Sequence, residues 1–194
     1  MRVLLVCLWV LMLGGCANRQ HYQLQDLPLP GAPGEDCCWQ AAQQLEIHYR
    51  QDVYRLSAAL ARTEQGASLV LLDPMGRRLF SIRQQGGQLE TYRAPELPQD
   101  LPERFLLASS MLVWWPLADW QHLQGSDWSL VAGVDTRELL YRGQPVLTAT
   151  YSPAPDSVSS GIGSATLVNK EIVQLQHHKI PLSIRVTTTQ WGAL

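Results

Sequence analysis

The sequence predicts a mainly β domain with one helical insert. Three observations support this fold class. Short strand-like segments separated by turn residues fill residues 46–93, a helical stretch covers residues 103–124, and strand-like segments return from residue 128 onward. The final segment alternates most clearly, and its apolar face carries Ile180, Leu182, Ile184 and Val186. One apolar and one polar face are typical of a strand in a sheet that covers a core or a cavity.

The N-terminus has the features of an exported lipoprotein. Arg2 precedes an apolar run over residues 3–13, which is too short for a membrane-spanning helix of roughly 20 residues. The run ends in Leu13-Gly14-Gly15-Cys16, which resembles the lipobox of bacterial lipoproteins. In that class the cysteine thiol takes a diacylglycerol and the peptide before it is removed. The alternative is an ordinary signal peptide that contains Cys16 by chance.

The lipobox divides the chain into three predicted regions. Residues 1–15 are a lipoprotein signal peptide, residues 16–38 are a lipidated N-terminus with a flexible tether, and residues 39–194 are one domain. Ala17 follows the cysteine, which in enterobacterial lipoproteins implies sorting to the outer membrane, facing the periplasm. We therefore expect a lipid-anchored protein of a Gram-negative outer membrane.

The composition favours apolar ligands over nucleic acid. The formal net charge is −2, and the aromatic residues do not interleave with basic ones. The hydrophobic fraction is 46% and the chain has seven Trp residues. Such a chain buries much apolar surface or lines a binding site with it.

Two adjacent cysteines, Cys37 and Cys38, remain once Cys7 leaves with the signal peptide and Cys16 is lipidated. In an oxidising compartment they form either a vicinal disulfide or a pair of buried thiols. The C-x-x-C spacing that would favour a redox role is absent.

The first half of the domain is predicted to be a meander. Residues 39–45 are either a short helix or the start of a strand. Four further segments then form antiparallel strands, at residues 53–62, 69–72, 79–83 and 88–93.

The helical stretch is predicted to consist of two pieces that meet at Trp115-Pro116, because proline is tolerated in the first turn of a helix but not in its interior. Trp114 and Trp115 are adjacent and cannot share one helix face. We therefore expect one of them to face the interior and the other to face outward. Strands resume at residues 128–134, followed by hairpins formed by residues 138–141 with 146–151 and by residues 166–168 with 171–176, with a loop over residues 152–163 between the two hairpins.

No motif in the sequence indicates catalysis. The G-x-S-x-G nucleophile motif is absent. His177 and His178 are neighbours, so in a strand they point to opposite faces and make a poor metal-binding pair. We therefore expect no enzyme activity, no metal and no cofactor, and binding is favoured over catalysis.

Two stretches resemble LolB, the outer-membrane receptor that accepts lipoproteins from a periplasmic carrier. LVLLDPMGRRLFSI (residues 69–82) matches an aliphatic strand, an Asn/Asp-Pro-apolar-Gly loop and an alternating strand. SSMLVWWPLADWQHL (residues 109–123) matches the helical segment, in which Pro-Leu precedes a Trp-containing helix. Within the LolA/LolB superfamily the chain is most similar to an uncharacterised family of LolB-like lipoproteins, whose members often lie in aryl polyene gene clusters.

The resemblance implies a curved, incomplete antiparallel β-barrel covered by a helical lid, with an apolar cavity between them. It also implies that Met75, in the loop formed by Asp73, Pro74, Met75 and Gly76, helps to place lipid into the membrane. The alternative for Met75 is an ordinary turn residue. The candidates for the walls of cavity and lid, which would otherwise be packed core, are Leu107, Met111, Leu112, Trp114, Trp115, Ile180, Leu182, Ile184 and Val186.

The sequence thus predicts an outer-membrane lipoprotein that binds acyl chains of a lipid or lipidated cargo and transfers them without catalysis. A periplasmic LolA-like carrier is the expected protein partner. The main alternative is a structural or assembly lipoprotein, with a filled core and an exposed apolar patch. A lipid-processing enzyme is a third alternative, for which the sequence nominates no nucleophile.

Overall fold

The computed structural model describes residues 22–30, 37–97, 102–152 and 172–194. Its ten strands form one antiparallel sheet in the order β5-β4-β3-β2-β1-β10-β9-β8-β7-β6. The strands are β1 (Trp39–Tyr49), β2 (Asp52–Thr63), β3 (Gly66–Leu72), β4 (Arg78–Gln85), β5 (Gln88–Arg93), β6 (Trp128–Ala132), β7 (Thr136–Tyr141), β8 (Gln144–Ser152), β9 (Ile172–His177) and β10 (Leu182–Ala193). The helical elements are η2 (Leu24–Asp26), α2 (Glu103–Trp114) and η3 (Leu117–Leu123).

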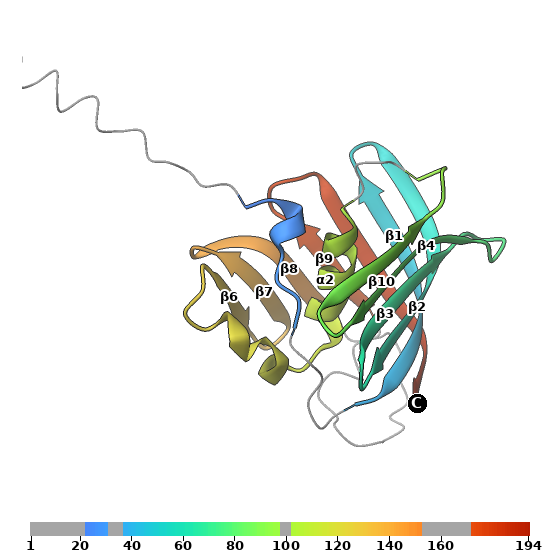
Figure 1. The fold of residues 1–194 in the computed structure, drawn as a ribbon. Helices are drawn as coiled ribbons and strands as arrows, with labels where there is room; N and C mark the ends of the chain where they lie inside the picture. The colour runs from blue at the N-terminus through green and yellow to red at the C-terminus, as the bar shows by residue number, and fades with distance from the viewer. Residues whose placement is uncertain (1–21, 31–36, 98–101, 153–171) are drawn as a thin grey trace, which may run out of the picture.

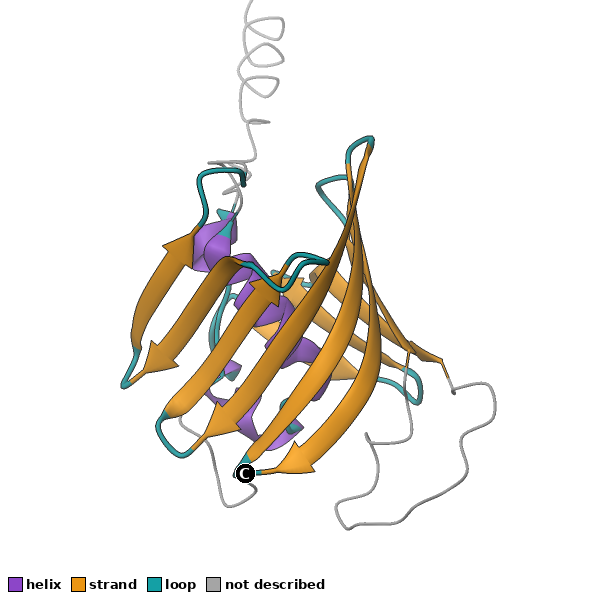
Figure 2. Cartoon of the chain, turned by 90° about the vertical axis from the view of Figure 1, so that its right-hand side faces the viewer, coloured by secondary structure: helices purple, strands orange, loops and turns teal. Residues whose placement is uncertain are grey.

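The sheet is curved and open. Strands β5 and β6 are its two edges, and the first and last strands, β1 and β10, pair at its centre. The sheet bends around α2, which lies against its concave face (Figures 1 and 2). The mainly β fold with a helical insert, arranged as an incomplete antiparallel barrel, is therefore confirmed.

Helix α2 is buried on nearly all sides, because most of its twelve residues are apolar and both the sheet and η2 pack against it. Its C-terminal carbonyls are satisfied by buried side chains of the sheet. The Arg137 guanidinium donates to the carbonyl oxygens of Leu112 (3.1 Å), Val113 (3.3 Å) and Trp115 (2.7 Å). The Tyr151 hydroxyl donates to Val113 O at 2.8 Å. These contacts fix the helix to β7 and β8.

The structure decides one open alternative and corrects several expectations. Of the two alternatives for residues 39–45, the strand is the correct one, because these residues pair with both β2 and β10. Ile180 lies in the bend before β10, so the alternating face of that strand begins at Leu182. Strand β6 ends at Ala132. The lipobox, nearly all of the predicted 152–163 loop and most of the hairpin around Asn169 lie outside the described residues.

Part of the predicted tether is packed onto the domain. Leu27 is fully buried, Leu29 is 8% exposed, and both belong to the hydrophobic core. The Arg104 side chain of α2 donates to the Leu27 carbonyl oxygen. Prolines and glycines predict a free linker, but the leucines between them supply apolar surface that covers α2.

Neither of the adjacent tryptophans faces outward. Trp114 is 5% exposed and Trp115 is 2% exposed. Trp115 packs edge-on against Trp39, and Trp114 contacts Trp191, which stacks on Trp39. The helix ends at Trp114, so the two side chains are not bound to opposite faces of one helix. Nearby, Cys37 and Cys38 form a disulfide rather than two thiols.

Candidate functional site

An apolar cavity of about 270 Å³ lies between the sheet, the start of α2 and η2. It is lined by Leu24, Ile47, Tyr49, Tyr54, Leu56, Leu71, Leu79, Leu97, Pro102, Leu106, Ile180 and Leu182. None of these side chains carries a charge. Seven of the twelve are only half-buried, so the cavity opens to the surface.

The position of the mouth follows from the strand directions. Tyr49 ends β1, Tyr54 lies near the start of β2, and Leu79 lies near the start of β4. These residues lie where the strands end on one side of the antiparallel sheet, and five connections lie on the same side: β1–β2, β3–β4, β5–α2, β7–β8 and β9–β10. We call this row of strand ends and connections the mouth rim. The far rim is the row at the opposite ends of the strands, and it includes the connections β2–β3, β4–β5 and β6–β7.

A projecting loop on the mouth rim carries Met75, which is 85% exposed (Figure 1). The side chain of Asp73 holds this loop in place through hydrogen bonds. Its carboxylate accepts hydrogen bonds from the backbone N–H groups of Met75 and Arg77, both at 2.9 Å, and from Arg77 Nε at 2.8 Å. These hydrogen bonds lower the pKa of Asp73. Gly76 completes the turn with φ +81°, a conformation that favours glycine.

A second, much smaller void of about 20 Å³ continues inward from the cavity, with Ile47, Leu71 and Leu106 bordering both. Two buried polar groups line it, the Gln43 amide and the Ser109 hydroxyl. Neither Gln43 Nε2 nor Ser109 Oγ has a hydrogen-bond partner among the described residues. The small void therefore adds a polar spot to the otherwise apolar lining of the cavity.

The structure separates the predicted wall residues into three groups. Ile180 and Leu182 line the cavity, and Trp114, Ile184 and Val186 line the small void. The other predicted wall residues are packed in the core and border neither space: Leu107, Met111, Leu112 and Trp115. Helix α2 therefore lines the cavity through Leu106, whereas Leu107 was the first residue of this helix that the sequence predicted for the wall.

Sequence reasoning missed the contributions of β1, β2 and η2 to the lining. Tyr49 and Tyr54 flank the β1–β2 turn, and Leu24 lies in the segment that Pro and Gly content marked as tether. The one available signal was local: tyrosine on both sides of a turn, where polar residues are usual.

His177 and His178 lie in different environments, because neighbouring residues at the end of a strand point in different directions. His177 is buried against Tyr22 and Phe105, and burial lowers its pKa to about 4. His178 is exposed and lies 2.7 Å from Thr148 Oγ1. In the part of the chain that the structure describes, no three His, Cys, Asp or Glu side chains gather as metal ligands would.

Among the described residues, no helix has the length and apolarity needed to cross a membrane. The candidate site in the described part of the chain combines two features. One is the uncharged cavity, and the other is the exposed Met75 loop on the same rim.

Comparison with known proteins yields one family match and several structural likenesses. Residues 40–190 match the family described as "Protein of unknown function (DUF3261)". No curated protein matches the sequence. A LolA superfamily protein from Nitrosomonas europaea is similar with a TM-score of 0.46 and 8% identity, over 84% of this chain and 89% of that one. A domain described as an outer membrane lipoprotein-sorting protein, from Vibrio parahaemolyticus, is similar with a TM-score of 0.40 and 7% identity, over 80% and 84% of the two chains.

Proposed function

The chain belongs to the DUF3261 family, and we propose that it is a non-catalytic, outer-membrane lipoprotein that binds an acyl chain and transfers it to the membrane. The observation that carries this proposal is the uncharged cavity of about 270 Å³ whose mouth shares a rim with the exposed Met75. The cargo is a lipid or a lipidated protein, delivered by a periplasmic carrier of the LolA kind.

The cavity addresses the main energetic obstacle to moving a lipid through water. At about 0.8 kcal/mol per CH₂, exposing a sixteen-carbon chain costs on the order of 12 kcal/mol. Walls made only of Leu, Ile, Pro and Tyr side chains offset part of this cost. A charged wall would instead add a desolvation penalty.

The size of the cavity favours one chain over a whole lipid. Pockets for small ligands span about 300–1,000 Å³, and this cavity lies just below that range. A single acyl chain therefore fits it better than the body of a diacyl lipid. The polar parts of the cargo would remain outside the mouth.

The anchor holds the protein at the site of delivery. More than one acyl chain on Cys16 makes release from a bilayer slow, so this protein receives and presents cargo rather than shuttling it. Met75 lies at the tip of its loop and is flexible and apolar, which suits a brief insertion among lipid chains.

A binding assay with a fluorescent fatty acid, on a soluble form that begins at Ala17, tests the cavity. Ile180→Trp places a large ring at the half-buried mouth and should weaken binding at least about tenfold, the equivalent of 1.4 kcal/mol. Leu117→Trp, at an exposed position outside the cavity, is the matched control. If the unmodified protein binds no fatty acid and copurifies with none, the carrier function is wrong.

A liposome delivery assay tests the loop. Met75→Glu should preserve the fold and fatty-acid binding but abolish transfer, because a carboxylate does not enter the hydrocarbon layer. Val134→Glu is the control, since Val134 is 91% exposed on the far rim. Normal transfer by the Met75 variant would remove the loop from the mechanism.

One observation favours the alternative of an assembly lipoprotein. The edge strand β6 carries no charged residue, and Val131 on it is 50% exposed. A groove of about 330 Å³ lies between β6 and η3. Edges of this kind pair with strands of other proteins. Val131→Lys would block such pairing while leaving acyl binding unchanged, and crosslinking in cells would reveal whether a partner is lost.

A further inference from the structure

The tyrosines of this protein are unevenly distributed. The chain has six, and five of them lie along the mouth rim: Tyr22, Tyr49, Tyr54, Tyr92 and Tyr141. The sixth, Tyr151, is buried at the other end of the sheet, under α2. Tyr49 and Tyr54 flank one turn, but Tyr22, Tyr92 and Tyr141 come from other segments of the chain, so the gathering as a whole is a property of the fold.

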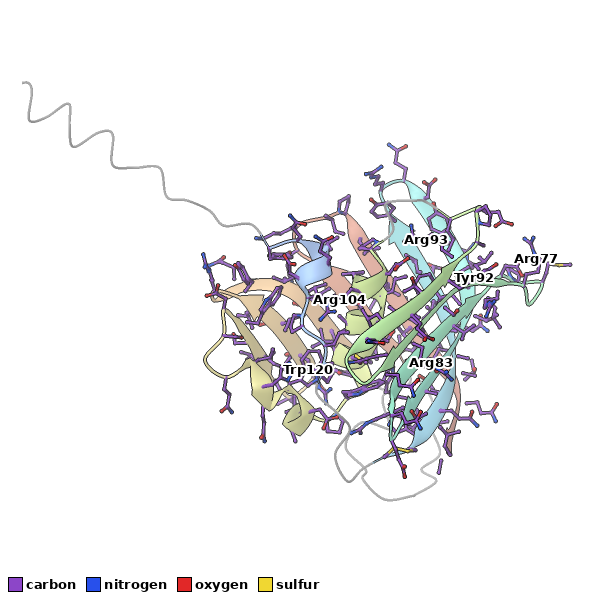
Figure 3. The ribbon with its side chains drawn as sticks, in the orientation of Figure 1. Arg77, Arg83, Tyr92, Arg93, Arg104 and Trp120 are labelled. Carbon is purple, nitrogen blue, oxygen red and sulfur yellow. A yellow bond between two sulfur atoms is a disulfide. The ribbon has the colours of Figure 1, made fainter. Side chains whose placement is uncertain are left out.

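Four of the rim tyrosines carry a cation over the ring. The distances from the cationic centre to the ring centroid are 4.7 Å for Lys179 and Tyr22, 5.0 Å for Arg50 and Tyr49, 4.1 Å for Arg78 and Tyr92, and 5.3 Å for Arg142 and Tyr141. All four cations are exposed, and each lies in or beside a turn of the mouth rim. Figure 3 shows Arg77 at the projecting loop and Tyr92 near its base, with Arg83 lying toward the far rim.

This pairing suits the boundary between water and lipid. Tyrosine rings concentrate at headgroup level, with an apolar body and a polar tip. Arginine and lysine stems lie along apolar surface while their charges remain in the polar layer. Of these four cations, Arg142 is also paired with Asp127, and Arg77 of the neighbouring loop is paired with Asp73.

The far rim has a different composition. Its turns contain glutamine, glutamate and glycine, including Glu64, Gln65 and Gly86, and none of its described connections contains a tyrosine. Val134 is exposed there, in the turn between Gly133 and Asp135. The two rims are separated by about 40 Å, the length of the twelve-residue strand β2 at about 3.3 Å per residue.

The N-terminal segment connects the mouth rim to the anchor. Tyr22 is held at this rim by Trp128 and Tyr141, at centroid distances of 5.3 and 5.4 Å. Only five residues lie between it and Cys16, and the six Cα–Cα steps that join the two span at most about 20 Å. A bilayer that holds Cys16 therefore lies within about 20 Å of the mouth rim.

We propose that the mouth rim is a membrane-contact surface, which rests on the headgroup layer of the bilayer through its tyrosine–cation pairs and keeps the cavity mouth facing the lipid. The proposal rests on the lipid anchor of the proposed function. It adds an orientation: cargo passes between cavity and bilayer without crossing bulk water.

Two matched cysteine variants test the orientation in the full-length, acylated protein. Gln51→Cys and Gln65→Cys occupy exposed positions in the turns at opposite ends of β2. Each is labelled with a fluorophore and reconstituted in phosphatidylethanolamine–phosphatidylglycerol vesicles that contain a headgroup-quencher lipid. Because the rims are about 40 Å apart, quenching at position 51 should exceed that at position 65 at least about threefold. Equal quenching, or stronger quenching at position 65, would overturn the proposal.

A second variant connects the quenching to the tyrosines. Tyr92→Ser combined with Tyr141→Ser, neither of which lines the cavity, in the Gln51→Cys background, should reduce quenching at least about twofold, since both rings leave the interface. Val134→Ser, on the far rim, should leave it unchanged. Fatty-acid binding measured on the same samples distinguishes the membrane contact of the mouth rim from acyl binding in the cavity. Binding without quenching at position 51 supports acyl binding and refutes the membrane contact. Quenching at position 51 without binding supports the membrane contact and refutes acyl transfer.

Discussion

The carboxylate of Asp73 accepts a hydrogen bond from the backbone N–H of Met75 at 2.9 Å. Asp73 is 9% exposed and Met75 is 85% exposed. The residue that fixes the loop is thus buried, while the residue that the loop presents stands in water. An apolar side chain held at an exposed tip by a buried carboxylate has a defined position, which a mobile turn would not provide.

Asp73→Ala should loosen the loop. The variant removes the acceptor of two backbone N–H groups and of the Arg77 side chain, so amide hydrogen exchange at Met75 and Arg77 should accelerate. Transfer to liposomes should fall, and fatty-acid binding should persist. Asp73→Asn retains one acceptor oxygen, so its amide hydrogen exchange and its transfer to liposomes should be close to those of the original protein. Unchanged exchange in the alanine variant would show that the backbone turn alone holds Met75.

Arg137→Met should destabilise the fold by about 3 kcal/mol, because the carbonyl oxygens at the end of α2 lose a buried charged donor. Burial already lowers the pKa of Arg137, yet three carbonyl oxygens and the Tyr151 ring stabilise its charge. Urea denaturation provides the measurement. Arg83→Met, at an exposed position of β4, should change stability by no more than about 0.5 kcal/mol. If Arg137→Met also changed stability by no more than about 0.5 kcal/mol, water would have replaced the guanidinium as the donor to these carbonyl oxygens.

Stability should fall between pH 6.5 and pH 4 through His177. Burial lowers its pKa from 6.5 to about 4, so over this range the unfolded chain binds a proton that the folded protein does not. The contribution is complete above pH 6.5 and is lost as the pH falls toward 4. Partial solvent screening reduces it to about 2 kcal/mol.

The hydrogen bonds at His177 explain the direction of this effect. Its Nδ1 accepts from the backbone N–H groups of Lys179 and Ile180, at 2.9 and 3.1 Å, and a proton there would face two donors. His177→Asn keeps an acceptor and cannot titrate. Denaturation curves of this variant should lack the pH-dependent component, and persistence of that component would assign it to another group.

Gln43→Met should stabilise the protein by about 1–2 kcal/mol, because a buried amide without a protein partner is replaced by an apolar side chain of similar shape. Gln44→Met, at the neighbouring exposed position, should be close to neutral. Thermal unfolding compares the two. A destabilised Gln43 variant would show that the amide is hydrogen-bonded at the deep end of the void.

Local pattern was sufficient for most strands and for α2. Leu69 and Leu71 alternate with less buried neighbours along β3, and a proline-interrupted apolar stretch produced two helical pieces. It did not decide the outcome where the partners are distant in sequence. Residues 39–45, for which helix and strand were both open, form a strand because β10 and β2 pair on either side. Leu27 was expected in a free tether but is buried, because it packs into the core beside Arg104 of α2.

The sequence by itself determined the fold class, the loop that carries Met75 and the candidate anchor at Cys16, because each depends on residues close together in the chain. Only the tertiary structure decided which apolar residues border a space and which are packed. Leu106 and Leu107 are adjacent leucines, yet only Leu106 lines the cavity. The gathering of most of the tyrosines on one rim is likewise not visible in the chain, since tertiary packing brings together segments as distant as Tyr22 and Lys179.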